Sequence, residues 1–270
     1  MIDPIDQEEL RLLYNPDGSQ LRDLQLSILS ILKHIDSICR RNNITYWLGS
    51  GTLLGAVRHG GFIPWDDDVD IEINRKDRKR FIEACKRDLP SNLHIQIHST
   101  EPDYYPNILK VRDDSTDIGE KIHLGTDKEY DTHFKVKGCF VDVFCVEKCV
   151  PSLLSFSNKI PFKILSARYE KGRSQLLCNI MWGAMECLNT LFRCIGYFFA
   201  PKDMYYPGYS SCFGEEYGYH KECIKPVKPV LFEGVELFVP ADPDGYLREM
   251  YGDYMALPPD KLRSSHHSSL

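Results

Sequence analysis

Four aspartates occur within five residues in the first third of the chain. In the stretch "GSGTLLGAVRHGGFIPWDDDVDIEI", residues 49 to 73, they lead directly into the strand-like run Val-Asp-Ile-Glu-Ile. Because alternate residues of a strand share a face, we expect the acidic side chains on one side and the apolar ones on the core side. The acidic set comprises Asp66, Asp68, Asp70 and Glu72. Carboxylates this close raise one another's pKa unless a cation lies among them, so the run predicts a divalent metal site.

A further carboxylate supports this interpretation. Asp142 lies at the centre of the apolar run "GCFVDVFCV", where an unpaired carboxylate is expensive to bury. Asp68 and Asp70, with Asp142 from a neighbouring strand, would converge on one or two Mg²⁺ or Mn²⁺ ions and leave the remaining coordination to water and a substrate phosphate. These three residues are the candidate metal ligands and catalytic residues.

Two alternatives stay open for the aspartate run itself. The first is a solvated acidic edge without a ligand. The second is a calcium loop, because the spacing of the aspartates matches the opening of an EF-hand. That match fails further on, where Ile71 replaces the turn-making glycine and Asp77 replaces the bidentate glutamate.

Candidate phosphate-binding groups flank the acidic run. Gly49 and Ser50 follow a predicted strand and precede a predicted helix, where backbone N–H groups can hold a phosphate. Together with the acidic strand downstream, this turn is typical of a nucleotidyltransferase site. Cationic side chains on the same elements could clamp a diphosphate as charge develops on the leaving group. They are Arg58, His59, Lys110 and Arg112. Taken singly, each is an ordinary surface charge, and His59 is equally well a structural histidine.

Hydrophobic periodicity predicts the elements that must position these residues. Helices are expected over 21–39, 52–59, 75–89 and 243–251, and strands over 44–48, 69–73, 94–98, 105–112 and 139–146. The fold class is therefore α/β (α+β) with a short mixed sheet, and the phosphate turn and acidic strand described above indicate a nucleotidyltransferase-like core. We expect residues 1–150 to form this core, 151–200 a helical annex, and 201–270 the part that completes the catalytic domain.

Composition favours an ordinary globular protein. The chain has 270 residues, 43% of them hydrophobic and 27% charged, with a net charge of −6, so no nucleic-acid partner is expected. The acidic N-terminus does not resemble a secretory signal, which predicts a cytoplasmic protein. The apolar segment 188–200 contains Arg193 and is too short to span a bilayer, but it leaves peripheral contact with the inner membrane face open.

The ten cysteines show no Cys-x-x-Cys pair, so most are expected to be reduced core residues. A zinc site formed by Cys212, His220 and Cys223 is a weak alternative, because a structural zinc site usually has four ligands.

Several motifs together resemble the LicD family of phosphocholine transferases, which is related to the fukutin-type ribitol-phosphate transferases. They are "YWLGSGTLLGAVRHGGFIPWDDDVDIEI", "KVRDDST", "GCFVDVF", "YLREMYGDYMALPP" and "RSSHH", which occur between about residue 27 and residue 267. The resemblance implies that Asp68 and Asp70 are the metal-binding pair, Asp142 the third acidic position, Gly49-Ser50 the phosphate turn, and Lys110 and Arg112 the basic pair.

The resemblance also implies the reaction. A phospho-alcohol would be transferred from a CDP-linked donor, such as CDP-choline, to a hydroxyl of a surface glycan such as lipopolysaccharide or its lipid-linked precursor, with release of CMP. Asp142 or Asp66 would take the hydroxyl proton, and we favour Asp142; His266 and His267 are further candidates. A true nucleotidyltransferase that releases pyrophosphate and a non-catalytic module that binds metal and nucleotide are the alternatives.

Overall fold

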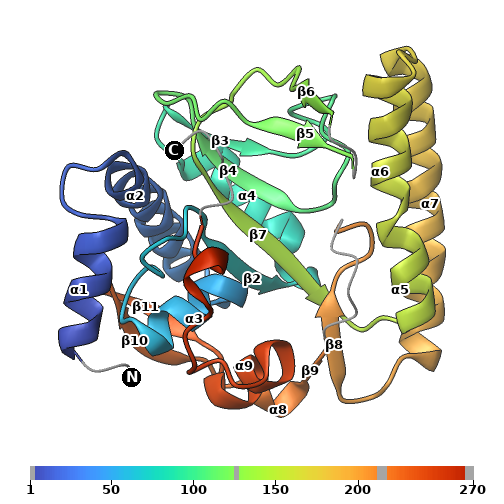
Figure 1. Ribbon diagram of the computed structural model, residues 1–270. Coiled ribbons are helices and arrows are strands. Elements are labelled where there is room, and N and C mark those ends of the chain that lie inside the picture. The colour runs from blue at the N-terminus through green and yellow to red at the C-terminus, as the bar shows by residue number, and fades with distance from the viewer. Residues whose placement is uncertain (1–3, 125–127, 212–217, 265–270) are drawn as a thin grey trace.

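The computed structural model describes residues 4–124, 128–211 and 218–264, and its centre is a mixed β-sheet (Figure 1). The main strand order is β1-β2-β7-β4-β3. These strands are β1 (Tyr46–Leu48), β2 (Asp70–Asn74), β7 (Phe140–Glu147), β4 (Leu109–Asp113) and β3 (Leu93–Gln96). β2 and β7 are parallel, and the other neighbours in this order are antiparallel. The predicted α/β class with a mixed sheet is confirmed.

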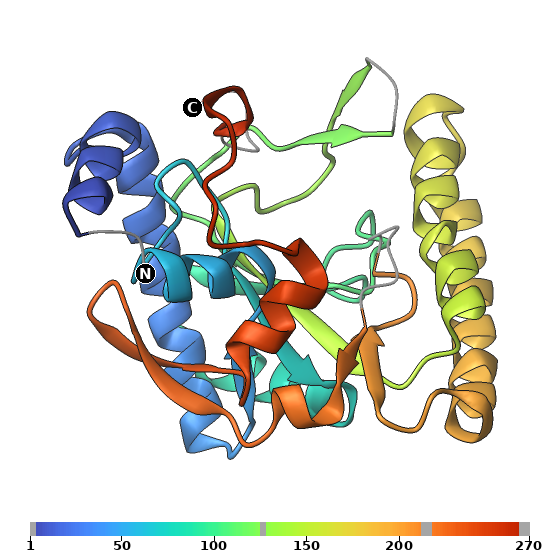
Figure 2. The same ribbon diagram turned by 60° about the horizontal axis from the view of Figure 1, so that its bottom comes forward.

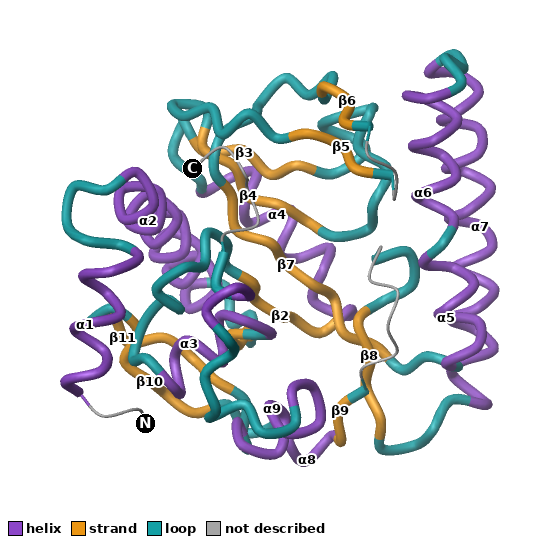
Figure 3. The backbone as a smooth tube through the Cα atoms, in the orientation of Figure 1, coloured by secondary structure: helices purple, strands orange, loops and turns teal. Residues whose placement is uncertain are grey.

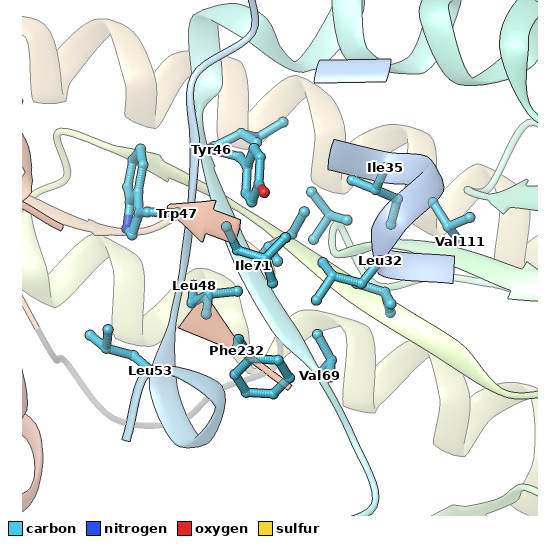
Figure 4. Close-up of a cluster of buried hydrophobic side chains, with 14 of the residues drawn as sticks. Leu32, Ile35, Tyr46, Trp47, Leu48, Leu53, Val69, Ile71, Val111 and Phe232 are labelled. Carbon is cyan, nitrogen blue, oxygen red and sulfur yellow. The ribbon is translucent and has the colours of Figure 1, made fainter. Parts of the chain in front are cut away.

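One face of the sheet is apolar and is covered by helices. α2 (Gln20–Arg41) and α4 (Arg78–Asp88) pack here, as the tube in Figure 3 shows. Leu32 and Ile35 of α2 lie beside Ile71 and Val111 of the sheet, and all four are buried (Figure 4). Burying one such side chain contributes roughly 1.5–3 kcal/mol, so this packing determines which face each strand turns inward.

The remaining elements close the edges of the core. The helix α3 (Ser50–Arg58) follows β1 directly and packs against α9 (Pro243–Tyr251). Further elements are α1 (Pro4–Tyr14), η1 (Arg75–Asp77), β5 (Lys121–His123), β6 (Glu129–Asp131), β8 (Met204–Pro207), β9 (Tyr219–His220), α8 (Lys221–Ile224), β10 (Lys228–Phe232), β11 (Val235–Val239) and η3 (Asp260–Leu262). β8 extends the sheet beside the end of β7, and β9 pairs with β8.

The segment 151–200 is helical, as its sequence predicts. It contains α5 (Pro151–Asn158), α6 (Ile160–Leu165), a π-helical turn η2 (Ser166–Glu170) and the long α7 (Gln175–Phe199). α5 and α6 pack against α7, and this group stands at one side of the molecule in both views (Figures 1 and 2). The division of the chain into domains at about 150 and 200 stays a prediction.

Two sequence predictions need comment here. The acidic strand begins one residue later than expected, since β2 runs from Asp70 to Asn74. Asp66 and Asp68, which were expected to share its acidic face, therefore lie in the preceding loop. The terminal helix agrees with its predicted ends, since Asp242 accepts a hydrogen bond from Gly245 N (3.0 Å) as N-cap and Gly252 ends the helix at φ 64°.

The described cysteines are all free, and six of the nine are buried, in agreement with the expectation of reduced core residues. Among the described residues, no helix combines the length and apolar character needed to cross a bilayer.

Candidate active site

Three neighbouring strands place the predicted site residues side by side. Asp142 at the start of β7 is directly paired with Asp70 of β2 on one side and with Lys110 of β4 on the other. Directly paired residues on adjacent strands point to the same face of a sheet, so all three side chains lie opposite the face that α2 covers. The sequence-based requirement that Asp70 and Asp142 share a face is met.

Asp142 and Lys110 form a buried ion pair. The Lys110 Nζ lies 2.9 Å from Oδ1 and 3.0 Å from Oδ2 of Asp142, and each side chain is only 12% exposed. The ammonium also lies 3.3 Å from the centroid of the Phe140 ring, a cation–π contact. Burial raises the pKa of Asp142, whereas Lys110 and then Arg112 oppose the rise. The pair thus keeps a carboxylate beside Asp70 that would otherwise be costly to bury.

The aspartate loop adds negative charge to the same place. Burial, followed by the charges of Asp68, Asp142 and Asp66, holds the pKa of Asp70 well above its ordinary value, and Lys110 opposes the shift. Burial and the charges of Asp68 and Asp67 do the same for Asp66. These mutual effects show that the carboxylates of the loop and of the strands lie close enough to repel one another.

The turn before α3 is joined directly to Asp70. Gly49 N donates to the Asp70 carbonyl oxygen (3.0 Å), and Asp70 N donates to Thr52 Oγ1 (2.8 Å). Ser50 has a φ of 44°, in the left-handed region that non-glycine residues rarely adopt, and such strain concentrates at functional sites. The predicted phosphate turn therefore lies immediately next to the carboxylates, at the positive end of a helix.

The two glycines of the turn allow this close approach. A Cβ at Gly49 would lie 3.0 Å from Glu72 Cγ, and a Cβ at Gly51 would lie 3.2 Å from Asp66 Oδ2. The carboxylate of Asp66 is thus beside the first turn of α3. Any larger side chain at either position would have to displace an acidic residue.

A buried network beneath the turn was not predicted. Glu72, which the sequence placed in the acidic set, accepts hydrogen bonds from Trp47 Nε1 (2.6 Å), Tyr246 OH (2.8 Å) and Tyr219 OH (3.1 Å). Burial raises its pKa to about 7 although the three hydrogen bonds lower it. The Tyr246 hydroxyl also accepts a hydrogen bond from Ser50 N (3.2 Å). The Glu72 carboxylate therefore accepts three hydrogen bonds, and through Tyr246 it helps to hold the backbone of the turn at Ser50.

Arg58 and His59 have other partners than those predicted. Arg58 Nη1 donates to the carbonyl oxygens of Tyr254 (2.7 Å) and Ala256 (3.2 Å), and its Nε donates to His59 Nε2 (2.9 Å). His59 Nδ1 lies 2.6 Å from Gln7 Oε1. Burial, with the Arg58 charge, lowers the pKa of His59 to about 3, so the ring is neutral. These contacts tie the C-terminal segment to α3, and they lend no support to a phosphate clamp.

Arg112 has buried partners on neighbouring segments. Its side chain is fully buried and donates to Gln96 Oε1 (2.8 Å) and the Gly138 carbonyl oxygen (2.9 Å), with a further ion pair to Glu120. The guanidinium has no exposed surface and holds these loops together, and its role in phosphate binding stays a prediction. Of the four predicted cationic residues, Lys110 is the one with an ion pair to a carboxylate of the site, that of Asp142.

The acidic site has the charge and the donor atoms that a divalent cation needs, but its side chains are not gathered around one point. Its donors are carboxylate oxygens, which Mg²⁺ and Mn²⁺ prefer, and the raised pKa values of Asp66 and Asp70 mark an excess of negative charge that a cation would relieve. Within the described ranges, however, no three His, Cys, Asp or Glu side chains form a ready metal-binding group. One of the predicted ligands, Asp142, is instead held by Lys110.

Three weaker candidates lie outside the residues that the structure describes. They are Cys212, His266 and His267. The zinc alternative and the C-terminal histidines as general bases thus stay predictions without a structural test.

The comparison with protein families agrees with this geometry. Residues 43–140 match the model "LicD/FKTN/FKRP, nucleotidyltransferase domain", and the match runs from the segment before β1 to the first residue of β7. This segment is similar to the nucleotidyltransferase domain of the LicD family. It contains the turn at Gly49 and Ser50, the aspartate loop and Lys110, and Asp142 follows two residues after its end.

Individual relatives extend the match unevenly. The chain is 28% identical over 268 residues to the lipopolysaccharide cholinephosphotransferase LicD of Haemophilus influenzae, which covers 92% of this chain and 96% of that protein. An uncharacterized protein of Rickettsia typhi is 52% identical over 56 residues, 21% of this chain and 18% of that protein. The human ribitol 5-phosphate transferase FKRP is 44% identical over 45 residues, 17% of this chain and 9% of that protein.

Proposed function

We propose that this chain is a phosphotransferase that moves a phosphocholine-type group from a CDP-linked donor to a hydroxyl of a surface glycan or its lipid-linked precursor, with CMP as the leaving group. The observation that carries the proposal is the juxtaposition of Asp70, Asp142 and Lys110 with the strained turn at Ser50. The near full-length similarity to a lipopolysaccharide cholinephosphotransferase supports the choice of the transferred group and of the acceptor class.

Each part of the site has a role in this proposal. The first turn of α3 would face the donor phosphates, where the helix end favours negative charge. Asp68 and Asp70, with Asp142, would hold Mg²⁺ or Mn²⁺, which would supply charge neutralisation for the diphosphate and the departing CMP. Lys110 would keep Asp142 ionised and oriented until substrate arrives.

The transfer is a displacement at phosphorus. The acceptor hydroxyl oxygen forms a bond to the phosphorus that carries the alcohol, and the bond from that phosphorus to the CMP oxygen breaks. The hydroxyl proton goes to a carboxylate, and Asp142 is the proposed acceptor because burial raises its pKa toward the range suited to a general base. Asp66, beside the first turn of α3, is the second candidate for this proton.

The test is CMP release from a panel of CDP-alcohols. The purified chain is incubated with CDP-choline, CDP-ethanolamine, CDP-glycerol or CDP-ribitol, with Mg²⁺ and a glycan acceptor fraction, and CMP is measured by chromatography. We expect CMP release that needs both acceptor and cation, and an acceptor mass increase equal to one phospho-alcohol.

The alternatives give different products. A true nucleotidyltransferase would release pyrophosphate from a nucleoside triphosphate and add a full nucleotide to the acceptor. A binding module would retain nucleotide and Mg²⁺ in equilibrium dialysis without any product. Either result, with no CMP formed from any donor in the panel, would refute the proposal.

A further inference from the structure

The long helix α7 has an outer face that carries no charge. Eleven of its residues are exposed, and they include Leu176 (72%), Ile180 (61%), Leu191 (54%), Tyr197 (82%), Phe198 (76%) and Phe199 (76%). The other exposed positions are alanine, cysteine, threonine and leucine. At 1.5 Å per residue the 25 residues of α7 extend for about 37 Å, so this uncharged face runs along one whole side of the molecule.

The two charged residues of α7 are turned away from this face. Glu186 accepts a hydrogen bond from Asn107 (2.5 Å), and Arg193 forms an ion pair with Glu147 (3.1 Å). Residues of the opposite face, such as Met185, are buried. The helix therefore has a fixed orientation, and its apolar side is the one that the rest of the described chain leaves uncovered. An exposed apolar surface of this extent marks an interaction site.

The segment that carries this face has an excess of basic residues. Residues 148–202 contain eight lysines and arginines against two glutamates, whereas the whole chain has a net charge of −6. Two of the eight, Arg168 and Arg193, are paired with Asp103 and Glu147 outside this segment. Lys171 and Arg173 precede α7, and Lys202 follows it; all three are exposed. Lys159, between α5 and α6, and Lys163 on α6 are also exposed, and neither forms an ion pair with a described residue. Basic residues thus frame an apolar and aromatic surface.

We propose that α7 lies along an anionic lipid bilayer, with its outer face in the boundary between headgroups and acyl chains and the flanking lysines against lipid phosphates. Apolar side chains, aromatic rings and basic residues are the features that hold a helix in the plane of a membrane surface. A second copy of this chain is a poorer partner, because contact between two such segments would bring like charges together. The inference does not depend on the proposed transferase activity.

Vesicle flotation of the full chain tests the proposal. We expect the protein to float with vesicles of phosphatidylcholine and 30% phosphatidylglycerol, and much less with phosphatidylcholine alone. Phe198→Ser with Phe199→Ser should weaken binding at least about tenfold, since both rings would leave the apolar phase. Lys159→Glu with Lys163→Glu should abolish the preference for anionic vesicles. The control Leu231→Ser removes another exposed apolar side chain (65%), on β10, and should change nothing.

A second measurement uses the native chain. Cys187 and Cys194 are the exposed cysteines on α7, whereas the other described cysteines are buried or, like Cys223, partly buried. Anionic vesicles should protect these two thiols from a water-soluble maleimide, and Cys187→Ser with Cys194→Ser should remove the protected signal. Equal labelling with and without vesicles, or no flotation of the wild-type chain, overturns the proposal. So does a dimer in sedimentation velocity that the Phe198 and Phe199 substitutions dissociate.

Discussion

The ion pair between Asp142 and Lys110 permits a test that separates catalysis from stability. Both side chains are 12% exposed, and the Lys110 Nζ lies within 3.0 Å of both carboxylate oxygens. Removing one partner of a buried pair costs about 3–5 kcal/mol of unfolding free energy, because the other charge stays buried. Asp142→Asn keeps an acceptor for the ammonium, so we expect the low end of this range, about 3 kcal/mol.

The same substitution should reduce turnover for a different reason. A positioned general base contributes at least about a hundredfold in rate, which corresponds to about 2.7 kcal/mol of transition-state stabilisation. Asp142→Asn should therefore lower kcat of CMP release about a hundredfold or more, with a much smaller change in the KM for the donor. Asp17→Asn, at an 80% exposed carboxylate, is the matched control and should leave both quantities unchanged.

The double variant Asp142→Asn with Lys110→Met decides between the two effects. It removes both charges, so urea unfolding should return to within about 1–2 kcal/mol of the wild type. Turnover should stay low, because the carboxylate is still absent. If the double variant regains activity along with stability, Asp142 serves only to neutralise Lys110. Turnover of Asp142→Asn within about threefold of the wild type would equally refute its role in the reaction.

Three further predictions concern the carboxylates and the turn. In metal-free buffer, Asp70→Asn should raise the melting temperature, because it removes a charge that repels its neighbours. Added Mg²⁺ should raise the melting temperature of the wild type but not of this variant. CMP release should be lost in both Asp70→Asn and Asp68→Asn. The pKa of Glu72 is about 7 in the folded state against 4.5 in the unfolded state, so the native state binds more protons between these pH values. The free energy of unfolding should therefore fall by about 3 kcal/mol from pH 4.5 to 7 through this group. Glu72→Gln should remove that part of the pH dependence in urea titrations. Gly49→Ala would place a methyl group 3.0 Å from Glu72 Cγ and should cost about 1–3 kcal/mol of unfolding free energy, and an unchanged urea midpoint would contradict the close approach.

The sequence predicts those parts of the site that depend on local pattern. The alternation of apolar and acidic residues assigns Asp70 and Asp142 to the outer face of their strands, and the run after Asp70 is apolar enough to be a buried strand. The pattern cannot fix where that strand begins. Backbone pairing decides this, and the partners Tyr46–Leu48 of β1 reach only from Ile71 to Ile73. Asp66 and Asp68 were therefore assigned to a strand that does not extend to them.

The sequence also does not show which partners the predicted phosphate-binding arginines have in the fold. Arg58 and Arg112 are of a residue type that commonly binds phosphate. The sequence does not reveal whether a guanidinium faces a substrate or a buried carbonyl oxygen. The partners of Arg58 lie 196 and 198 residues further along, and the glutamate that pairs with Arg112 lies on a loop eight residues away. No local spacing announces such pairs.

The tyrosine network gives a physical reason why residues beyond the matched family domain belong to the same working unit. Tyr219 and Tyr246 lie 147 and 174 residues from Glu72, yet their rings stack at a centroid distance of 4.1 Å and both hydroxyls bond its carboxylate. Tyr246 also accepts the hydrogen bond from Ser50 N, the residue with the strained backbone. Strain of this kind costs on the order of 1–3 kcal/mol and persists only where surrounding contacts hold it. The turn that would receive the donor phosphates is thus supported by the C-terminal part of the chain. A fragment that ends at Phe140 would keep Asp66, Asp68 and Asp70, but it would lose both Asp142 and the contact that shapes the turn.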